Sequence, residues 1–143
     1  MQSAPVWVHA LYNEMNVTLT FLKTVTLRDK PELQLAASSL YRVFVNGELI
    51  GYGPARAAHG FSRVDRYSLE KWAHETVVIA VDVHSAQVNS FYVVDEKPFF
   101  MADILDGSHV TATAEDFTAY PRTDRLQKVR RFSFQRTFTE SYR

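Results

Sequence analysis

Six residues between positions 56 and 72 have the side-chain types that recognise sugars. Arginine offers paired N–H donors, a carboxylate offers paired acceptors, and a flat aromatic ring covers the apolar C–H face of a sugar. In the alternative interpretation the arginines are structural and pair with Asp65 or with a neighbouring domain. The candidates for carbohydrate binding or for contact between domains are Arg56, His59, Arg63, Asp65, Tyr67 and Trp72.

The other acidic residues do not suggest a catalytic pair. Hydrolysis of a glycosidic bond needs two carboxyl groups that face one sugar, roughly 5–10 Å apart. The acidic candidates lie beside Pro, Gly or other turn residues, where we expect solvated carboxylates. We therefore expect no catalytic residue in this chain. The carboxylates considered are Asp95, Glu96, Asp103, Asp106, Glu115 and Asp116.

The histidines do not suggest a metal site. No two of the five lie two or four residues apart, and the chain has no cysteine, so we expect no zinc site. The sequence also has no Gly-x-Ser-x-Gly motif and no phosphate-binding glycine loop. We expect no cofactor, although a structural calcium ion held by loop carbonyls stays open.

Charge and composition narrow the classes of partner. Basic and acidic residues both number 16, so the net charge is zero, and we expect no nucleic-acid partner. Basic and aromatic residues do alternate over Arg130–Arg136, and we interpret these aromatics as core residues of a strand. No apolar run is long enough to span a membrane.

The first residues lack the basic and apolar segments of a signal peptide. We therefore expect either a cytosolic protein or a piece of a longer one, and the compartment stays open.

The elements that must position these residues are mostly strands. Apolar and polar residues alternate from Met15 to Leu27, which predicts a half-buried strand. Asn46-Gly47 between two strand-like runs predicts a hairpin over residues 41–52, because a type I′ turn needs positive φ at both central residues.

Ser68 is expected to cap a short helix over 68–75. The β-branched run 76–83 predicts a central strand buried on both faces. Further strands are expected at 33–37, 91–94, 99–104, 109–113 and 132–142.

About nine short strands with frequent turns predict an all-β chain, folded as an antiparallel β-sandwich or jelly roll with at most one short helix. The polar run that begins at Arg122 is the best candidate for a connection that leaves the sandwich. We therefore predict a sandwich domain with its lead-in over residues 1–121. Residues 122–143 would form a connecting segment and a terminal strand toward the next domain of a longer protein.

Six segments carry a family resemblance: Tyr41–Gly47, Gly51–Arg56, Val64–Leu69, Thr76–Val83, Arg131–Arg136 and Thr139–Tyr142. Together they resemble the N-terminal β-sandwich domain of bacterial α-L-rhamnosidases and related large glycoside hydrolases. The resemblance covers most of residues 41–83 and the C-terminal stretch. One departure is His74-Glu75, where that family usually has a Gly-Glu-Asn-like turn.

The resemblance implies a non-catalytic, galactose-binding-like accessory domain of a longer enzyme. In such enzymes the catalytic unit is an (α/α)₆ barrel, so no catalytic residue carries over to this chain. The implied partners are neighbouring domains of the same polypeptide and rhamnose-containing carbohydrate. A periplasmic or secreted parent enzyme fits the resemblance. The alternatives are a carbohydrate-binding module in its own right and an unrelated β-sandwich interaction domain.

Overall fold

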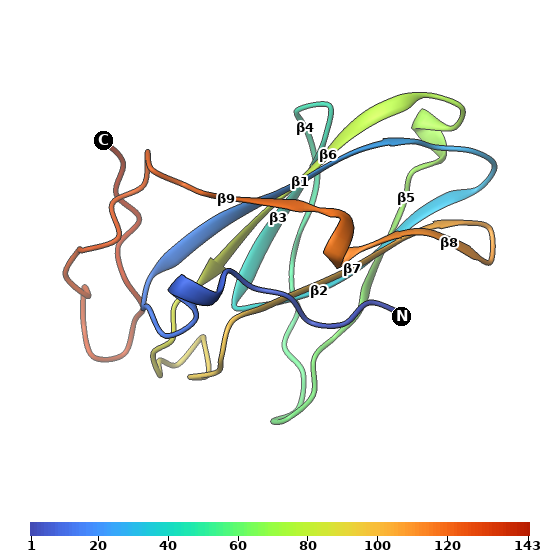
Figure 1. Cartoon of the computed structure of the whole chain (residues 1–143). Coiled ribbons are helices and arrows are strands. Elements are labelled where there is room, and N and C mark those ends of the chain that lie inside the picture. The colour runs from blue at the N-terminus through green and yellow to red at the C-terminus, as the bar shows by residue number, and fades with distance from the viewer.

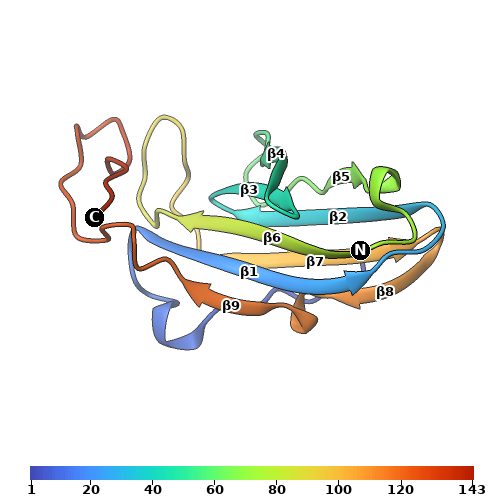
Figure 2. The same cartoon turned by 90° about the horizontal axis from the view of Figure 1, so that it is seen from above.

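Alternating side chains organise the chain into two antiparallel sheets that pack face to face (Figures 1 and 2). The computed structural model describes all 143 residues. The five-stranded sheet has the order β4–β3–β6–β1–β9, and the four-stranded sheet has the order β5–β2–β7–β8. The predicted all-β sandwich is therefore confirmed. The strands are β1 (Val17–Thr26), β2 (Pro31–Ser38), β3 (Leu40–Val45), β4 (Glu48–Gly53), β5 (Asp65–Ser68), β6 (Thr76–Ser85), β7 (Phe99–Asp106), β8 (His109–Thr113) and β9 (Thr118–Pro121).

The helical content consists of three single-turn 3-10 helices, where the sequence suggested one short helix at most. They are η1 (His9–Leu11), η2 (Glu70–Trp72) and η3 (Ala114–Asp116). Ser68 is the last residue of β5, so it is not the N-cap of η2; that position belongs to Leu69. None of these turns has the length or the apolar character of a membrane-crossing helix.

The core lies between the two sheets and joins them through stacked rings. Phe21 of β1 and Phe100 of β7 stack with their ring centroids 4.0 Å apart, and Phe117 meets Phe100 edge-on at 5.3 Å. Offset and edge-on aromatic pairs add about 0.5–1.5 kcal/mol beyond the burial of their surface. The inward residues of β6 complete this layer: Val77, Ile79, Val81 and Val83.

The predicted hairpin forms β3 and β4. Asn46 and Gly47 have φ values of 50° and 83°, as a type I′ turn requires. Asn46 also extends the pairing with β6, because its side-chain oxygen accepts a hydrogen bond from the backbone N–H of Val78 at 2.9 Å. The hairpin is thereby fixed to the centre of the five-stranded sheet.

The prediction that 76–83 is buried on both faces is wrong. The strand is central in the sheet, between β3 and β1, but its residues alternate between buried and more exposed positions. Val78 is 43% exposed on the outer face. β-branched residues are favoured in strands on both buried and exposed faces of a sheet. An unbroken run of them therefore does not show that one face is open to solvent.

The predicted strand over 91–94 is absent, because side chains fix this segment as a loop. The hydroxyl of Ser90 accepts hydrogen bonds from the backbone N–H groups of Tyr92 and Val93 at 3.1 and 3.0 Å. The side-chain oxygen of Asn89 accepts another from the N–H of Asp95. Such local bonds compete with the pairing of strands.

The C-terminal strand predicted over 132–142 does not form either. Only two isolated bridges occur there, Arg125 with Tyr142 and Arg131 with Phe138. The guanidinium of Arg131 instead binds the carbonyls of residues 89, 134 and 136. Phe134 is 93% exposed, so the interpretation of these aromatics as core residues is also wrong.

Two further features differ from the sequence analysis. The strand β9 was not expected; it pairs with β1 at one edge of the five-stranded sheet. Asp103 is not a solvated turn carboxylate but a buried residue of β7. Its carboxylate accepts hydrogen bonds from the backbone N–H groups of Gln2 and Ser3, and so ties the first residues of the chain to the four-stranded sheet.

A cluster of three side chains joins the two sheets at one edge of the sandwich. The hydroxyl of Tyr41, on β3, donates to the carboxylate of Asp65, on β5. Because that proton is committed to Asp65, the hydroxyl of Tyr67 donates to the Tyr41 oxygen, at 2.8 Å. Burial, followed by the bonds to Asp65 and Tyr67, raises the pKa of the Tyr41 hydroxyl far above its usual value.

We expect Tyr41→Phe to lower the free energy of unfolding by about 1–3 kcal/mol, because the Asp65 carboxylate loses a donor in a largely buried position. Urea unfolding followed by fluorescence measures the change. Tyr120→Phe is the matched control, since Tyr120 is half exposed and its hydroxyl makes no hydrogen bond within the protein. Equal stabilities of the two variants would contradict a structural role for the cluster.

Candidate functional site

The structure divides the six candidate residues among three places. Asp65 and Tyr67 belong to the cluster that joins the sheets, and Arg63 pairs with Asp65 at 2.9 Å. Trp72 is only 8% exposed and packs in the hydrophobic core. Its ring faces are therefore covered by the protein, and it does not lie with the others.

The remaining candidates meet at a cavity between two loops. Arg56, His59 and Arg63 line a space of about 460 Å³ between residues 54–63 and 90–96. We call this space the loop cavity. The guanidinium of Arg56 donates to the backbone carbonyl of Phe91 at 2.6 Å, so it joins the two loops. The structure thus brings three of the six candidates together.

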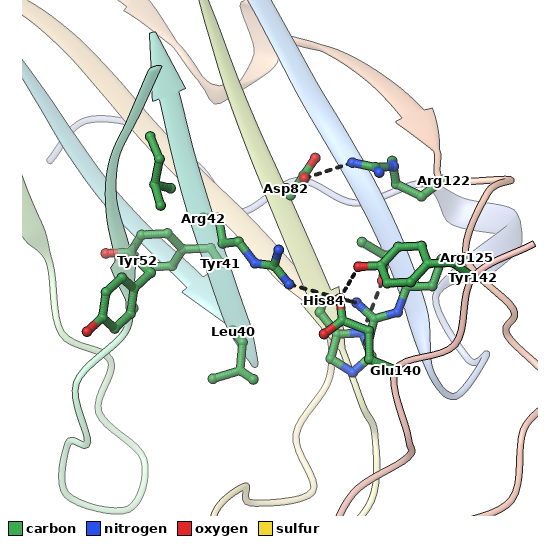
Figure 3. Close-up of a pocket in the computed structure, with 13 residues that line it drawn as sticks. Leu40, Tyr41, Arg42, Tyr52, Asp82, His84, Arg122, Arg125, Glu140 and Tyr142 are labelled. Atoms are coloured by element: carbon green, nitrogen blue, oxygen red, sulfur yellow. Dashed lines mark hydrogen bonds and ion pairs between the residues drawn. The ribbon is translucent and has the colours of Figure 1, made fainter. Parts of the chain in front are cut away.

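A second cavity, on the outer face of the five-stranded sheet, was not found by sequence analysis. We call it the sheet pocket, and its volume is about 470 Å³ (Figure 3). Strands β3, β4, β6 and β1 supply its floor, and the C-terminal segment, residues 122–143, supplies one side. Its main lining residues are Thr18, Leu40, Arg42, Leu49, Tyr52, Asp82, His84, Arg122, Arg125, Glu140 and Tyr142.

Strand register places the floor residues in two parallel rows. In the first row, Leu40, His84 and Thr18 lie directly opposite one another on β3, β6 and β1. In the second row, Tyr52, Arg42, Asp82 and Thr20 lie opposite one another from β4 to β1. Cross-strand neighbours on one face are close enough to touch. The rows therefore present a fixed set of polar groups on a rigid sheet.

Ion pairs attach the C-terminal segment to this floor. Glu140 accepts from Arg42 of β3 at 2.9 Å, from the hydroxyl of Tyr142, and pairs with Arg125 at 3.4 Å. The hydrogen bond from Tyr142, followed by the nearby arginines, lowers the pKa of the Glu140 carboxyl. Glu140 is therefore ionised at neutral pH and holds the segment against β3.

Arg122 makes a second attachment. It donates to Asp82 of β6 at 2.8 Å and binds both oxygens of Asp124, at 2.8 and 2.6 Å. Fork-like pairing of this kind is strong and fixes the orientation of the guanidinium. The hydroxyl of Thr20 donates to the other oxygen of Asp82, so both oxygens of that carboxylate are occupied.

His84 lies in the floor of the sheet pocket and is neutral at physiological pH. Its Nδ1 lies 3.1 Å from the hydroxyl oxygen of Thr18. Burial, followed by the positive charge of Arg125, lowers the pKa of the imidazole to about 4.

The sheet pocket escaped the sequence analysis because the run 76–83 was interpreted as fully buried. The sequence pattern that indicates the pocket is the alternation within Val81-Asp82-Val83-His84, which places two polar side chains on the same face. No local sequence pattern indicates the pocket residues of the C-terminal segment, because tertiary contacts alone bring them to the sheet.

The two carboxylates of the sheet pocket are each held by arginine. Glu140 pairs with Arg42 and Arg125, and Asp82 pairs with Arg122. No place in the structure gathers three or more His, Asp or Glu side chains that could hold one metal ion.

We expect acid to weaken the fold through His84. Its pKa is about 4 in the folded state and 6.5 without the protein environment, so the unfolded chain takes up the proton first. The free energy of unfolding should decrease as pH falls from about 6.5 to about 4, by the order of 3 kcal/mol, and this contribution should then level off. Denaturant melts across this range measure it. The variant His84→Gln should lose this part of the pH dependence, and an unchanged dependence would contradict the assignment.

We expect Glu140→Gln to loosen the C-terminal segment, because it removes the charge that attracts Arg42 and Arg125. Hydrogen exchange followed by mass spectrometry should show several-fold faster exchange in residues 122–143 and unchanged exchange in β6. Glu48→Gln is the control, since Glu48 pairs with Lys71 on the surface away from this segment. Equal exchange in the two variants would show that the ion pairs do not hold the segment.

The chain is similar to known proteins in its structure but not in its sequence. No protein-family model and no curated protein sequence matches the chain. Among solved structures, the GH78 family rhamnosidase of Bacillus sp. GL1 aligns with 99% of this chain at a TM-score of 0.90 and 21% identity. The α-L-rhamnosidase from Dictyoglumus thermophilum aligns with 88% of it at a TM-score of 0.61 and 16% identity.

A lectin shares the same architecture. The apo form of the Pleurotus ostreatus lectin aligns with 96% of this chain at a TM-score of 0.54 and 16% identity, over 38% of the lectin chain. Our chain spans only 16% and 15% of the lengths of the two rhamnosidase chains. The resemblance seen in the sequence is confirmed at the level of the fold: the chain has the fold of a β-sandwich domain that occurs within α-L-rhamnosidases.

Proposed function

We propose that the chain is a non-catalytic accessory domain of an α-L-rhamnosidase-like glycoside hydrolase, packed beside an (α/α)₆ catalytic barrel of the same polypeptide. One observation carries the proposal: the similarity spans 99% of this chain but only 16% of the Bacillus rhamnosidase chain, at a TM-score of 0.90. In that enzyme a segment of this fold therefore shares its polypeptide with other parts.

The charge pattern of the sheet pocket supports an accessory role. Hydrolysis of a glycoside needs a carboxylic acid that can give a proton to the leaving oxygen. Glu140 is bound by two arginines and a tyrosine hydroxyl, and Asp82 by an arginine and a threonine hydroxyl. For Glu140 the bond from Tyr142, followed by the nearby arginines, lowers the pKa of the carboxyl and disfavours its protonated form.

One end of the sandwich offers a surface for packing against another domain. The loop 86–98 contacts two other segments there: the carbonyl of Phe91 accepts from Arg56 of loop 54–63, and the N–H of Phe91 donates to the carbonyl of Gln135 in the C-terminal segment. Clustered exposed apolar side chains mark interaction surfaces. The large aromatic side chains exposed on these three segments, which we call the aromatic end, are Phe61, Phe91, Tyr92, Phe132 and Phe134.

A second candidate function is carbohydrate binding by the domain itself. The similarity to a lectin favours it. So do the arginine and aromatic residues of the loop cavity, whose types suit the hydroxyls and the C–H face of a sugar. The two functions are compatible within one enzyme, because an accessory domain can hold a polymeric substrate near the catalytic domain.

The accessory role predicts no turnover by the purified 143-residue chain. Release of nitrophenol from an aryl α-L-rhamnoside should equal the rate in buffer, because in the accessory role the acid and the base of hydrolysis belong to the catalytic barrel and not to this chain. Circular dichroism and a cooperative melt would first establish that the chain is folded. Turnover that is lost on heating and regained on refolding would contradict the proposal.

The sequence of the full gene tests whether a catalytic barrel belongs to the same polypeptide. The reading frame that encodes this chain should continue into several hundred helix-rich residues. A frame that encodes the sandwich alone would contradict packing beside a barrel of the same polypeptide.

A further inference from the structure

We propose that the sheet pocket binds an uncharged pyranose sugar, with the ring placed against Tyr52 and its hydroxyls directed toward Arg42 and His84. The inference rests on the carbohydrate-binding candidate above, and it names a different site from the one that the sequence suggested. Its support comes from the shape, charge and rigidity of the pocket.

The shape suits one small ligand. The volume of about 470 Å³ lies within the roughly 300–1,000 Å³ that is usual for small-molecule sites. Tyr52 and Tyr142 stand on opposite sides of the floor, and Arg42 lies between them (Figure 3). A ring that enters between the two tyrosines meets the polar groups of β3 and β6 beneath it.

The apolar part of the lining gathers on one side. Leu40, Leu49 and Tyr52 are all about half exposed or more, and Tyr52 reaches 80%. Exposed apolar side chains are common singly, but three around one cavity form an apolar contact surface. A pyranose has an apolar C–H face that suits such a surface.

The charges of the pocket balance, which favours an uncharged ligand. Arg122 is paired with Asp82 and Asp124, while Arg42 and Arg125 share Glu140. The lining thus has three arginines and two carboxylates, and Asp124, which lies outside the lining, supplies the third carboxylate through its pair with Arg122. Within these ion pairs no positive charge is left over for an anion. Hydroxyl groups both donate and accept, so a sugar can use arginine N–H groups and the neutral His84 ring together.

The polar groups are already oriented by the fold. Arg42, Asp82 and His84 stand on strands whose pairing fixes their spacing, and ion pairs fix the guanidinium groups. In the loop cavity, by contrast, one N–H donor of Arg56 is already hydrogen-bonded to the carbonyl of Phe91. Side chains held on strands lose less conformational entropy on binding than side chains on loops, so less of the binding free energy is lost to ordering them.

Titration of the ¹⁵N-labelled chain by NMR tests the site and the class of ligand. The probes are L-rhamnose, D-galactose and D-galacturonate, of which the last two differ only in carrying a hydroxymethyl or a carboxylate group. We expect L-rhamnose or D-galactose to shift the amide signals of Arg42, Tyr52 and His84, with a dissociation constant of roughly millimolar order. D-galacturonate should bind more weakly than D-galactose, and tighter binding of the acid would overturn the uncharged class.

Substitutions identify the contacting ring. Tyr52→Ala should raise the dissociation constant about tenfold, because the sugar loses its stacking surface. Tyr120→Ala is the matched control: Tyr120 is a half-exposed tyrosine on the same sheet face that does not line the pocket, and its loss should leave binding unchanged. Equal effects of the two variants would overturn the proposed placement of the sugar.

The outcomes separate this inference from the proposed function. Shifts confined to Arg56, His59 and Arg63 would overturn the sheet pocket and leave carbohydrate binding in place at the loop cavity. If none of the sugars shifted any amide, both the inference and the carbohydrate-binding candidate would be overturned. The accessory role would stand in either case, because it is tested by turnover and by the reading frame.

Discussion

The alternation of side chains along β6 is the constraint on which both the core and the sheet pocket depend. Val81 and Val83 point into the core, while Asp82 and His84 point to the outer face. A slip of one residue in its pairing with β3 and β1 would bury a carboxylate and expose two valines. The cost of burying that charge keeps the register unique, so the energetics of the core also determine the layout of the site.

Residue types alone could not separate binding groups from structural ones. Asp65 and Tyr67 have the chemistry of sugar recognition, yet the structure uses them with Tyr41 to hold one sheet against the other. Trp72, the flattest ring among the candidates, is part of the core. Hydrogen-bonding and aromatic groups stabilise buried edges of a fold for the same physical reasons that they bind ligands, and only position distinguishes the two uses.

Local patterns were enough to predict most of the scaffold. The alternation from Met15 to Leu27 and the turn at Asn46-Gly47 act over a few residues, so the sequence contains their whole cause. The segments predicted wrongly depend on side chains that bind backbone groups: Ser90 and Asn89 act locally on 91–94, whereas Arg131 joins the C-terminal segment to the distant carbonyl of Asn89. The side of the sheet pocket was missed because its contacts are also distant, since Glu140 reaches Arg42 across 98 positions of sequence.

The two parts of the sheet pocket are built by different means. Its floor belongs to strands joined by backbone ladders, whereas one side belongs to a segment attached after the last strand by side-chain ion pairs. The sequence of that segment can therefore change with little effect on the core. A sandwich constructed in this way can acquire a different lining on one side of this pocket by substitution in residues 122–143, while its strands, and hence its folding, stay the same.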